Sequence, residues 1–285
     1  MKPIHRPTII AILLCASQLA SLAQESKKEG TGTGKIKLAA RVQAGGTYQL
    51  EQSVKTTMDG GKQDHTAIQD YTLTVTAHGS GGKDKLVRSR VDRVRIETNA
   101  TGDGARIAYD SADRNKQHAA LAEMGKGMLA IKTAAIYGED EIFKSFEGAV
   151  TDQGSRSMMQ KLTDLGFPDG PVGPGDVWKH RIEAEMGQLG KVSYDLDYSF
   201  TKMATLDGAN CAQLAISGSM STVPGAAANE GFDLKSRKLS GVMYFDPELG
   251  AVRKFEINSD LDLTAYGTKM PASMVLRTVL KKFSK

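Results

Sequence analysis

One stretch of the chain decides its fold class: Trp178-Lys179-His180-Arg181-Ile182-Glu183-Ala184-Glu185-Met186 and, after a short turn, Val192-Ser193-Tyr194-Asp195-Leu196-Asp197-Tyr198-Ser199-Phe200. In both segments apolar side chains alternate with polar ones. This period of two residues is typical of a strand with one buried face and one solvent-exposed face. Gly187-Gln188-Leu189-Gly190 separates the two and provides glycines for a tight connection. One-sided strands joined by short turns are typical of antiparallel sheets.

The same alternation continues towards both ends of the chain. It predicts strands over 48–58 and 70–77, with a hairpin turn at Asp59-Gly60-Gly61, and strands over 212–216 and 255–263, with a turn at Asp246-Pro247-Glu248-Leu249-Gly250. The sequence therefore predicts a mainly β protein. Its architecture is an antiparallel curved sheet, or several, or an open barrel, with one or two short helices.

A phase slip marks the strand expected over 87–96. Along it the apolar residues move from odd to even positions and the arginines from even to odd: Val87, Arg88, Arg90, Val91, Arg93, Val94, Arg95 and Ile96. One extra residue near Val91-Asp92, a β-bulge, would put every apolar side chain inside and every arginine outside. We interpret the arginines as a solvated strand face, because no aromatic residues are interleaved to stack on nucleic-acid bases.

Two segments have helical spacing. Ala119, Leu121, Met124 and Met128 predict a short helix that Gly125 and Gly127 would end. Met158, Met159, Leu162 and Leu165 form one apolar stripe, which favours a second helix packed on the core.

The N-terminus has the pattern of an export signal. Lys2, His5 and Arg6 form a basic start, Thr8–Leu22 carries no charge, and Ser21-Leu22-Ala23 offers small residues at alternate positions for cleavage. The apolar run is shorter than the roughly 20 residues that span a bilayer. Lipid attachment at Cys15 is rejected because a leucine, not a small residue, precedes it. We expect an exported protein, periplasmic or secreted, with no transmembrane segment in the mature chain.

The domain organisation follows from this signal and from one proline- and glycine-rich segment. We assign residues 1–23 to the signal peptide, 24–34 to a flexible polar leader, 35–166 to a first antiparallel half with short helices, and 167–285 to a second antiparallel half. The segment Phe167–Gly175 divides the halves, either as a linker or as a crossover within one continuous domain.

Charge and cysteine content exclude some functions. Cleavage leaves 262 of the 285 residues and removes Lys2 and Arg6, so the formal net charge falls from +4 to +2. A nearly neutral chain does not steer nucleic acid, and we expect no nucleic-acid partner. Cys211 is then the single cysteine, so no internal disulfide is expected and packing holds the fold. We interpret Cys211 as a structural residue beneath a helix or loop.

No residue pattern identifies an enzyme or a metal site. The chain has no Gly-x-Ser-x-Gly and no His-Glu-x-x-His motif, and His65, His78, His118 and His180 lack metal-ligand spacing. His180 lies in an apolar phase beside Trp178 and is interpreted as a core histidine. We assign no catalytic, cofactor-binding or metal-ligating residue and expect no cofactor.

Two aspartate pairs leave an alternative open. Asp195 with Asp197 and Asp260 with Asp262 each put two carboxylates on one strand face, and converging carboxylates could bind calcium or act as acid and base. Both pairs also stand where alternation requires polar residues, so we interpret them as solvated faces.

One segment resembles a known family. Pro168-Asp169-Gly170-Pro171-Val172-Gly173-Pro174-Gly175-Asp176-Val177-Trp178 is similar to the Pro-x-x-Pro-Val-x-x-Gly-Asp-x-Trp signature of an uncharacterised family of exported bacterial proteins, and Gly241, Phe245-Asp246 and Gly250 resemble its later turn. The resemblance would cover most of the mature chain. It implies export and a strand-rich fold, and no activity.

Together these patterns favour an exported, non-enzymatic module that binds either an apolar or amphipathic molecule or a cell-envelope partner. The methionine-rich segment Met158–Leu165 would suit a lid over such a ligand. The alternatives are a secreted hydrolase that uses the aspartate pairs and a purely structural envelope protein. Ligand identity and oligomeric state are left open by the sequence.

Overall fold

The structure is a computed structural model that describes residues 34–58, 63–99, 105–147, 165–185, 191–223, 232–265 and 267–285. The predicted signal peptide, most of the polar leader and the predicted helix over Met158–Leu165, except for Leu165 itself, lie outside the described residues. Among the described residues, no helix is long and apolar enough to cross a membrane.

Strands make up most of the described chain. The elements are β1 (Thr47–Met58), β2 (Gln63–His78), β3 (Asp84–Thr98), β4 (Ile107–Asp110), the 3-10 helix η3 (Arg114–Lys116), α2 (Ala119–Leu129), β5 (Lys132–Tyr137), β6 (Phe143–Phe146), β7 (Val177–Glu185), β8 (Lys191–Leu206), β9 (Ala209–Thr222), β10 (Phe232–Asp246), β11 (Ala251–Ala265) and β12 (Thr268–Ser284). The mainly β class predicted from alternation is confirmed.

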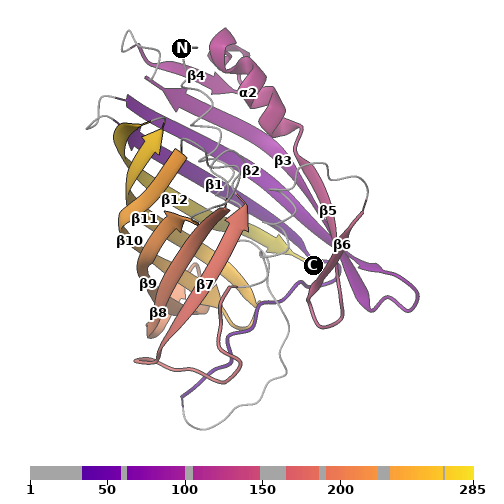
Figure 1. The fold of residues 1–285 in the computed structure, drawn as a ribbon. Coiled ribbons are helices and arrows are strands. Elements are labelled where there is room, and N and C mark those ends of the chain that lie inside the picture. Colours follow the sequence, from indigo (N-terminus) through magenta and orange to yellow (C-terminus); the bar gives the residue numbers. More distant parts are fainter. Residues whose placement is uncertain are drawn as a thin grey trace.

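All these strands belong to one antiparallel sheet (Figure 1). Its order is β6-β5-β3-β2-β1-β12-β11-β10-β9-β8-β7, with β4 paired to β3. The first and last strands, β1 and β12, pair from Thr47 opposite Ser284 to Met58 opposite Ala272. This pairing joins the two halves of the chain in one sheet that does not close into a barrel.

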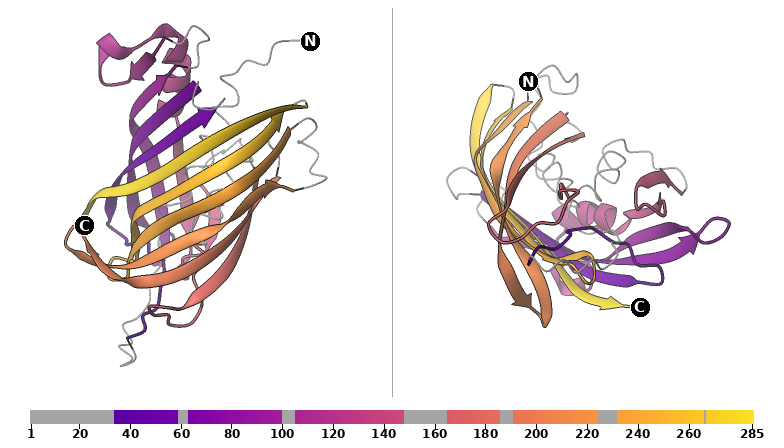
Figure 2. Two further views of the ribbon diagram at one scale, coloured as in Figure 1. Left: turned by 90° about the vertical axis from the view of Figure 1, so that its left-hand side faces the viewer. Right: turned by 90° about the horizontal axis from the view of Figure 1, so that it is seen from below.

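The sheet curves strongly, so that it has a concave inner face and a convex outer face (Figure 2). The main apolar core lies on the inner face and draws residues from both halves, among them Leu50, Val54, Phe200, Met243 and Leu276. The outer face carries the polar residues of the alternating pattern. Each strand therefore buries one side, which is the arrangement that its sequence period requires.

The predicted β-bulge in β3 is confirmed. Asp70 of β2 lies opposite Arg93 and the next residue, Tyr71, lies opposite Val91, so Asp92 is the extra residue. The slip puts Val94 on the same face as Val91, and Val94 is fully buried. One inserted residue thus keeps the apolar side chains inside along the whole strand.

The arginines of β3 lie on the outer face, as predicted, but not all of them are fully solvated. Arg88 and Arg90 are exposed, whereas the side chains of Arg93 and Arg95 are 42 % and 30 % exposed. Arg93 donates to both carboxylate oxygens of Asp110, at 3.0 and 2.6 Å, and lowers the pKa of that carboxyl. These ion pairs hold the long side chains against the sheet.

Helix α2 packs on the inner face of β2, β3 and β4. Its buried Leu121 and Met128 contact a second apolar cluster that contains Ile96 and Tyr109. The helix was predicted, but its expected end was wrong, because Gly125 lies within α2 and does not terminate it. A Cβ at this position would stand 2.1 Å from the Tyr109 ring, so the glycine is required by close packing and not by a helix stop.

The division into residues 35–166 and 167–285 stays a prediction. The β1–β12 pairing and the shared core connect the halves structurally, which agrees with the one-domain alternative.

Candidate functional site

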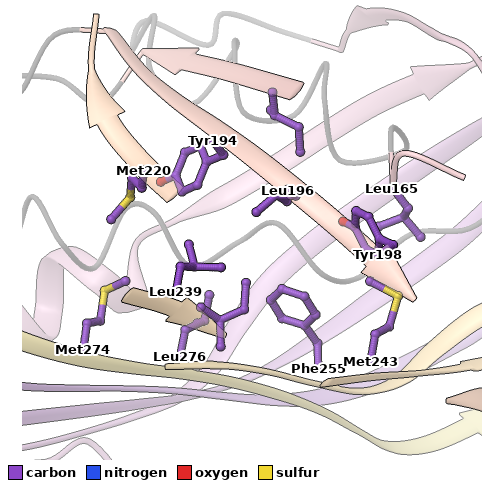
Figure 3. A pocket seen from close by; sticks show the side chains of 12 residues that line it. Leu165, Tyr194, Leu196, Tyr198, Met220, Leu239, Met243, Phe255, Met274 and Leu276 are labelled. Carbon is purple, nitrogen blue, oxygen red and sulfur yellow. The ribbon is translucent and has the colours of Figure 1, made fainter. Parts of the chain in front are cut away.

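An apolar cavity lies on the inner face of the second half of the sheet (Figure 3). Its walls come from β7 to β12 and from one residue that precedes β7: Leu165, Ile182, Tyr194, Leu196, Tyr198, Met220, Leu239, Met243, Phe255, Ile257, Met274 and Leu276. None of these side chains carries a charge. The volume of the cavity is about 50 Å³.

Two inner-face glycines leave positions above the strands without a side chain. Gly218 of β9 lies between Leu196 and Leu239, and Gly241 of β10 lies opposite Ile257. A Cβ at these glycines would come within 2.0 and 2.3 Å of backbone carbonyl oxygens on neighbouring strands. Leu196, Leu239 and Ile257, which lie opposite these glycines, line the cavity, so the glycines border the recess.

Three methionines give this cavity adaptable walls. Met220, Met243 and Met274 come from three different strands and contribute unbranched side chains with several rotatable bonds. The cavity is small beside the roughly 300–1,000 Å³ of typical small-molecule sites. A larger apolar occupant must therefore displace side chains, and methionines are the residues that do so at least cost.

Trp178 stands directly behind one wall of the cavity. Its indole stacks on the Tyr198 ring, with centroids 5.5 Å apart and planes 3° from parallel. The indole N–H donates to the Gly166 carbonyl at 2.8 Å. Gly166 has a φ of +69° and packs on the ring of His180. These contacts fix the segment that delivers Leu165 to the cavity.

The proline- and glycine-rich segment forms an ordered turn before β7. The Asp176 carboxylate accepts hydrogen bonds from Lys35 Nζ at 2.9 Å and from the Gly173 N–H at 3.0 Å, and these lower its pKa. Gly175, with a φ of +94°, donates its N–H to the Phe200 carbonyl at 2.8 Å. The segment leads directly into β7, whose Trp178 stacks on Tyr198.

A buried polar row crosses the inner face of the first half. Thr56 lies opposite Met274 on one side and opposite His65 on the other, and His65 lies opposite Thr98. His65 is only 1 % exposed, and neither ring nitrogen has a hydrogen-bond partner among the residues that the structure describes. Burial lowers the pKa of His65 to about 4, which the nearby carboxylate of Asp64 only partly offsets. His65 is therefore neutral at physiological pH.

A second polar row runs parallel to the first. Gln52 Nε2 donates to Thr278 Oγ1 at 3.5 Å, and the Gln52 side chain also hydrogen-bonds the Tyr71 hydroxyl. Gln69 lies opposite Gln52 and is buried as well. The inner face thus has an apolar half around the cavity and a half that contains uncharged polar groups.

The aspartate pairs do not form a site. Asp195 and Asp197 belong to β8, lie on the outer face, and stand 3.6 and 3.5 Å from Arg181 and Lys179. Asp260 and Asp262 belong to β11, two intervening strands away. No cluster of three or more potential metal ligands occurs among the described residues.

The other residues singled out from the sequence have structural surroundings. His180 lies on the inner face next to Gly166, but it is half-buried and not fully buried as a core residue would be. Cys211 is fully buried, and its thiol pKa is raised to about 11, first by burial and then by the charge of Asp246. A thiol with this pKa is not nucleophilic at neutral pH.

Sequence reasoning missed the buried polar rows. Their signal was present, since Gln52 and Thr56 share the phase of Leu50 and Val54, and His65 shares the phase of Tyr71. Polar residues at apolar positions within alternating strands indicate an inner-face site.

No family model and no curated protein matches the chain. Solved structures do resemble it. One is a structure that describes lipid–protein interactions in lipovitellin, with a TM-score of 0.51, 7 % identity, and coverage of 85 % of this chain and 26 % of that chain. The likeness is one of fold. The chain spans about a quarter of the lipovitellin chain.

Two bacterial structures match with lower TM-scores. A Bacteroides fragilis protein with a YmcC-like fold has a TM-score of 0.31, 11 % identity, and coverage of 85 % of this chain and 97 % of its own. A DUF1329 family protein from Desulfovibrio piger has a TM-score of 0.19, 8 % identity, and coverage of 84 % and 86 %. TM-scores this low do not support an inference about the fold or function of this chain. The family resemblance based on Pro168–Trp178 stays a prediction.

Proposed function

We propose that this is an exported, non-enzymatic protein that binds an apolar or amphipathic molecule on the concave face of its sheet. The observation that carries the proposal is the apolar cavity on the inner face of β7 to β12, whose lining side chains carry no charge. Among the described residues that line it, only the two tyrosines have hydrogen-bonding groups, and an alkyl chain would otherwise contact apolar atoms. The fold likeness to a lipid-associated protein supports the same class of ligand.

Residues from five of the six strands around the cavity belong to one apolar core that also extends into the first half of the sheet. An occupant would therefore contact a sheet whose shape is already set by packing elsewhere. A preorganised sheet backbone reduces the ordering cost of binding, so that the rearrangement is confined to the side chains that line the cavity.

The single tryptophan gives a direct assay. Trp178 touches Tyr198, which lines the cavity, so an apolar molecule that displaces Tyr198 changes the environment of the indole. We expect titration with N-phenyl-1-naphthylamine, an uncharged apolar probe, to shift Trp178 fluorescence saturably. Detergent-free native mass spectrometry should also show a bound apolar molecule.

Two variants locate the binding. Leu239→Phe adds bulk inside the cavity and should weaken probe binding by about tenfold or more, while Val279→Phe adds bulk on the outer face of β12 and should not. If both variants bind the probe like the wild type, or if the wild type shows no saturable binding, the proposed function is wrong.

A further inference from the structure

His65 is an unusual residue to find on the inner face, because a buried imidazole without partners lowers the stability of the fold. Both nitrogens are shielded from water and make no hydrogen bond within the described part of the chain. A buried polar group that is left unpaired is unfavourable, because it has lost its hydrogen bonds to water without gaining others. A molecule that supplied the missing hydrogen bonds would recover that free energy on binding.

His65 and the cavity share one row of the sheet. The row runs from His65 through Thr56 to Met274, which lines the cavity. Two strand spacings separate His65 from Met274, so their backbones are roughly 10 Å apart. A molecule whose chain fills the cavity would have to extend roughly 10 Å along this row, past the buried Thr56, to reach the imidazole.

The charges nearby restrict the chemistry of the group that meets His65. A neutral imidazole offers one N–H donor and one nitrogen acceptor. The described inner-face positions of β1, β2, β11 and β12 carry no charged side chain, and the Asp64 carboxylate is held by Arg106 at 2.8 Å. Lys85, at the opposite end of β3, is ion-paired with Glu141. An ionic head group would therefore be buried without a counter-ion.

We infer that the ligand of this protein is an amphipathic molecule with an uncharged, hydroxyl-bearing head group that hydrogen-bonds His65, its alkyl chain occupying the cavity between β7 and β12. This inference rests on the proposed function and adds the polar end of the site. A hydroxyl both donates and accepts, which matches the two nitrogens of a neutral histidine. Fatty alcohols and monoacylglycerols have this chemistry.

The test compares three twelve-carbon probes: dodecan-1-ol, dodecane and dodecanoate. Each is titrated at pH 8 against the mature protein loaded with N-phenyl-1-naphthylamine, and displacement is followed by fluorescence. Wild type should bind dodecan-1-ol at least tenfold more tightly than dodecane or dodecanoate. His65→Phe should reduce the affinity for dodecan-1-ol about tenfold and leave that for dodecane unchanged.

Two further variants separate the imidazole from its surroundings. His65→Gln keeps one donor and one acceptor and should retain the preference for the alcohol within about threefold. His78→Phe makes the same replacement near the other end of β2 and should change nothing. If His65→Phe does not fold, the inference is tested by two results: the preference of wild type for dodecan-1-ol and the retention of that preference in His65→Gln.

The displacement assay separates two kinds of failure, that of the proposed function and that of the role of His65. If no probe displaces the dye, the proposed function itself is wrong. If the probes bind but show no preference for the alcohol, or if His65→Phe binds dodecan-1-ol as wild type does, the cavity binds apolar chains and the assignment of His65 is overturned.

Discussion

At the scale of single residues, the buried imidazole of His65 makes stability depend on pH. Its pKa in the folded protein is about 4, against the ordinary value of 6.5. Between these values the unfolded chain binds a proton that the folded protein does not, so stability falls as pH falls through this window. His65→Phe removes this dependence.

We therefore expect the free energy of unfolding of His65→Phe, relative to that of wild type, to rise by up to about 3 kcal/mol as the pH falls from 7 to 4. Urea unfolding at several pH values measures this difference, and the carboxylates common to both proteins cancel. A difference that is constant with pH would mean that His65 titrates normally in the folded state.

Gly166 is the second residue whose surroundings permit a sharp prediction. Its φ is +69°, and an added Cβ would stand 2.3 Å from Cγ of His180. Gly166→Ala should therefore destabilise the protein by about 1–3 kcal/mol and change the fluorescence of Trp178, which hydrogen-bonds its carbonyl.

The matched control for this variant is Gly170→Ala. This glycine lies in the same segment, and a Cβ there meets nothing within 4 Å. Its replacement should leave the urea midpoint within the range of ordinary surface substitutions, about 0.5 kcal/mol. Equal losses from both variants would show that Gly166 does not pack against His180.

At the scale of elements, the bulge in β3 makes a deletion informative. Without Asp92, either Val94 and Ile96 or Val87 and Val91 would turn to the outer face, because side chains alternate with a period of two. We expect the protein without Asp92 to be unfolded or insoluble. Removal of Gly81, in the exposed turn between β2 and β3, should be tolerated, and far-UV circular dichroism distinguishes the two results. A folded protein without Asp92 would contradict the register.

Strands and the bulge were predictable because their period is a local property of the sequence. The end of α2 was not, since Gly125 is explained by the Tyr109 ring, which comes from β4 and touches the helix only in the folded chain. The cavity was not predictable either. The apolar phase showed which side chains lie inside, but the recess depends on where Gly218 and Gly241 fall in the register of neighbouring strands.

At the scale of the whole molecule, the pairing of β1 with β12 and the shared core predict cooperative unfolding. Trp178 reports on the second half, whereas far-UV circular dichroism reports on all strands. The two signals should follow one coincident transition in urea. Two separate transitions would instead mean that residues 35–166 and 167–285 are independent domains.

The central claim is that the concave face holds an alkyl chain beside a neutral histidine. Crystals of the mature protein grown with 12-bromododecan-1-ol test it most directly, because bromine scatters anomalously and marks the end of the chain. We expect one bromine peak in the cavity among Leu239, Met243 and Phe255, with the hydroxyl directed towards His65. Bromine on the outer face, or an empty cavity at saturating ligand, would contradict it.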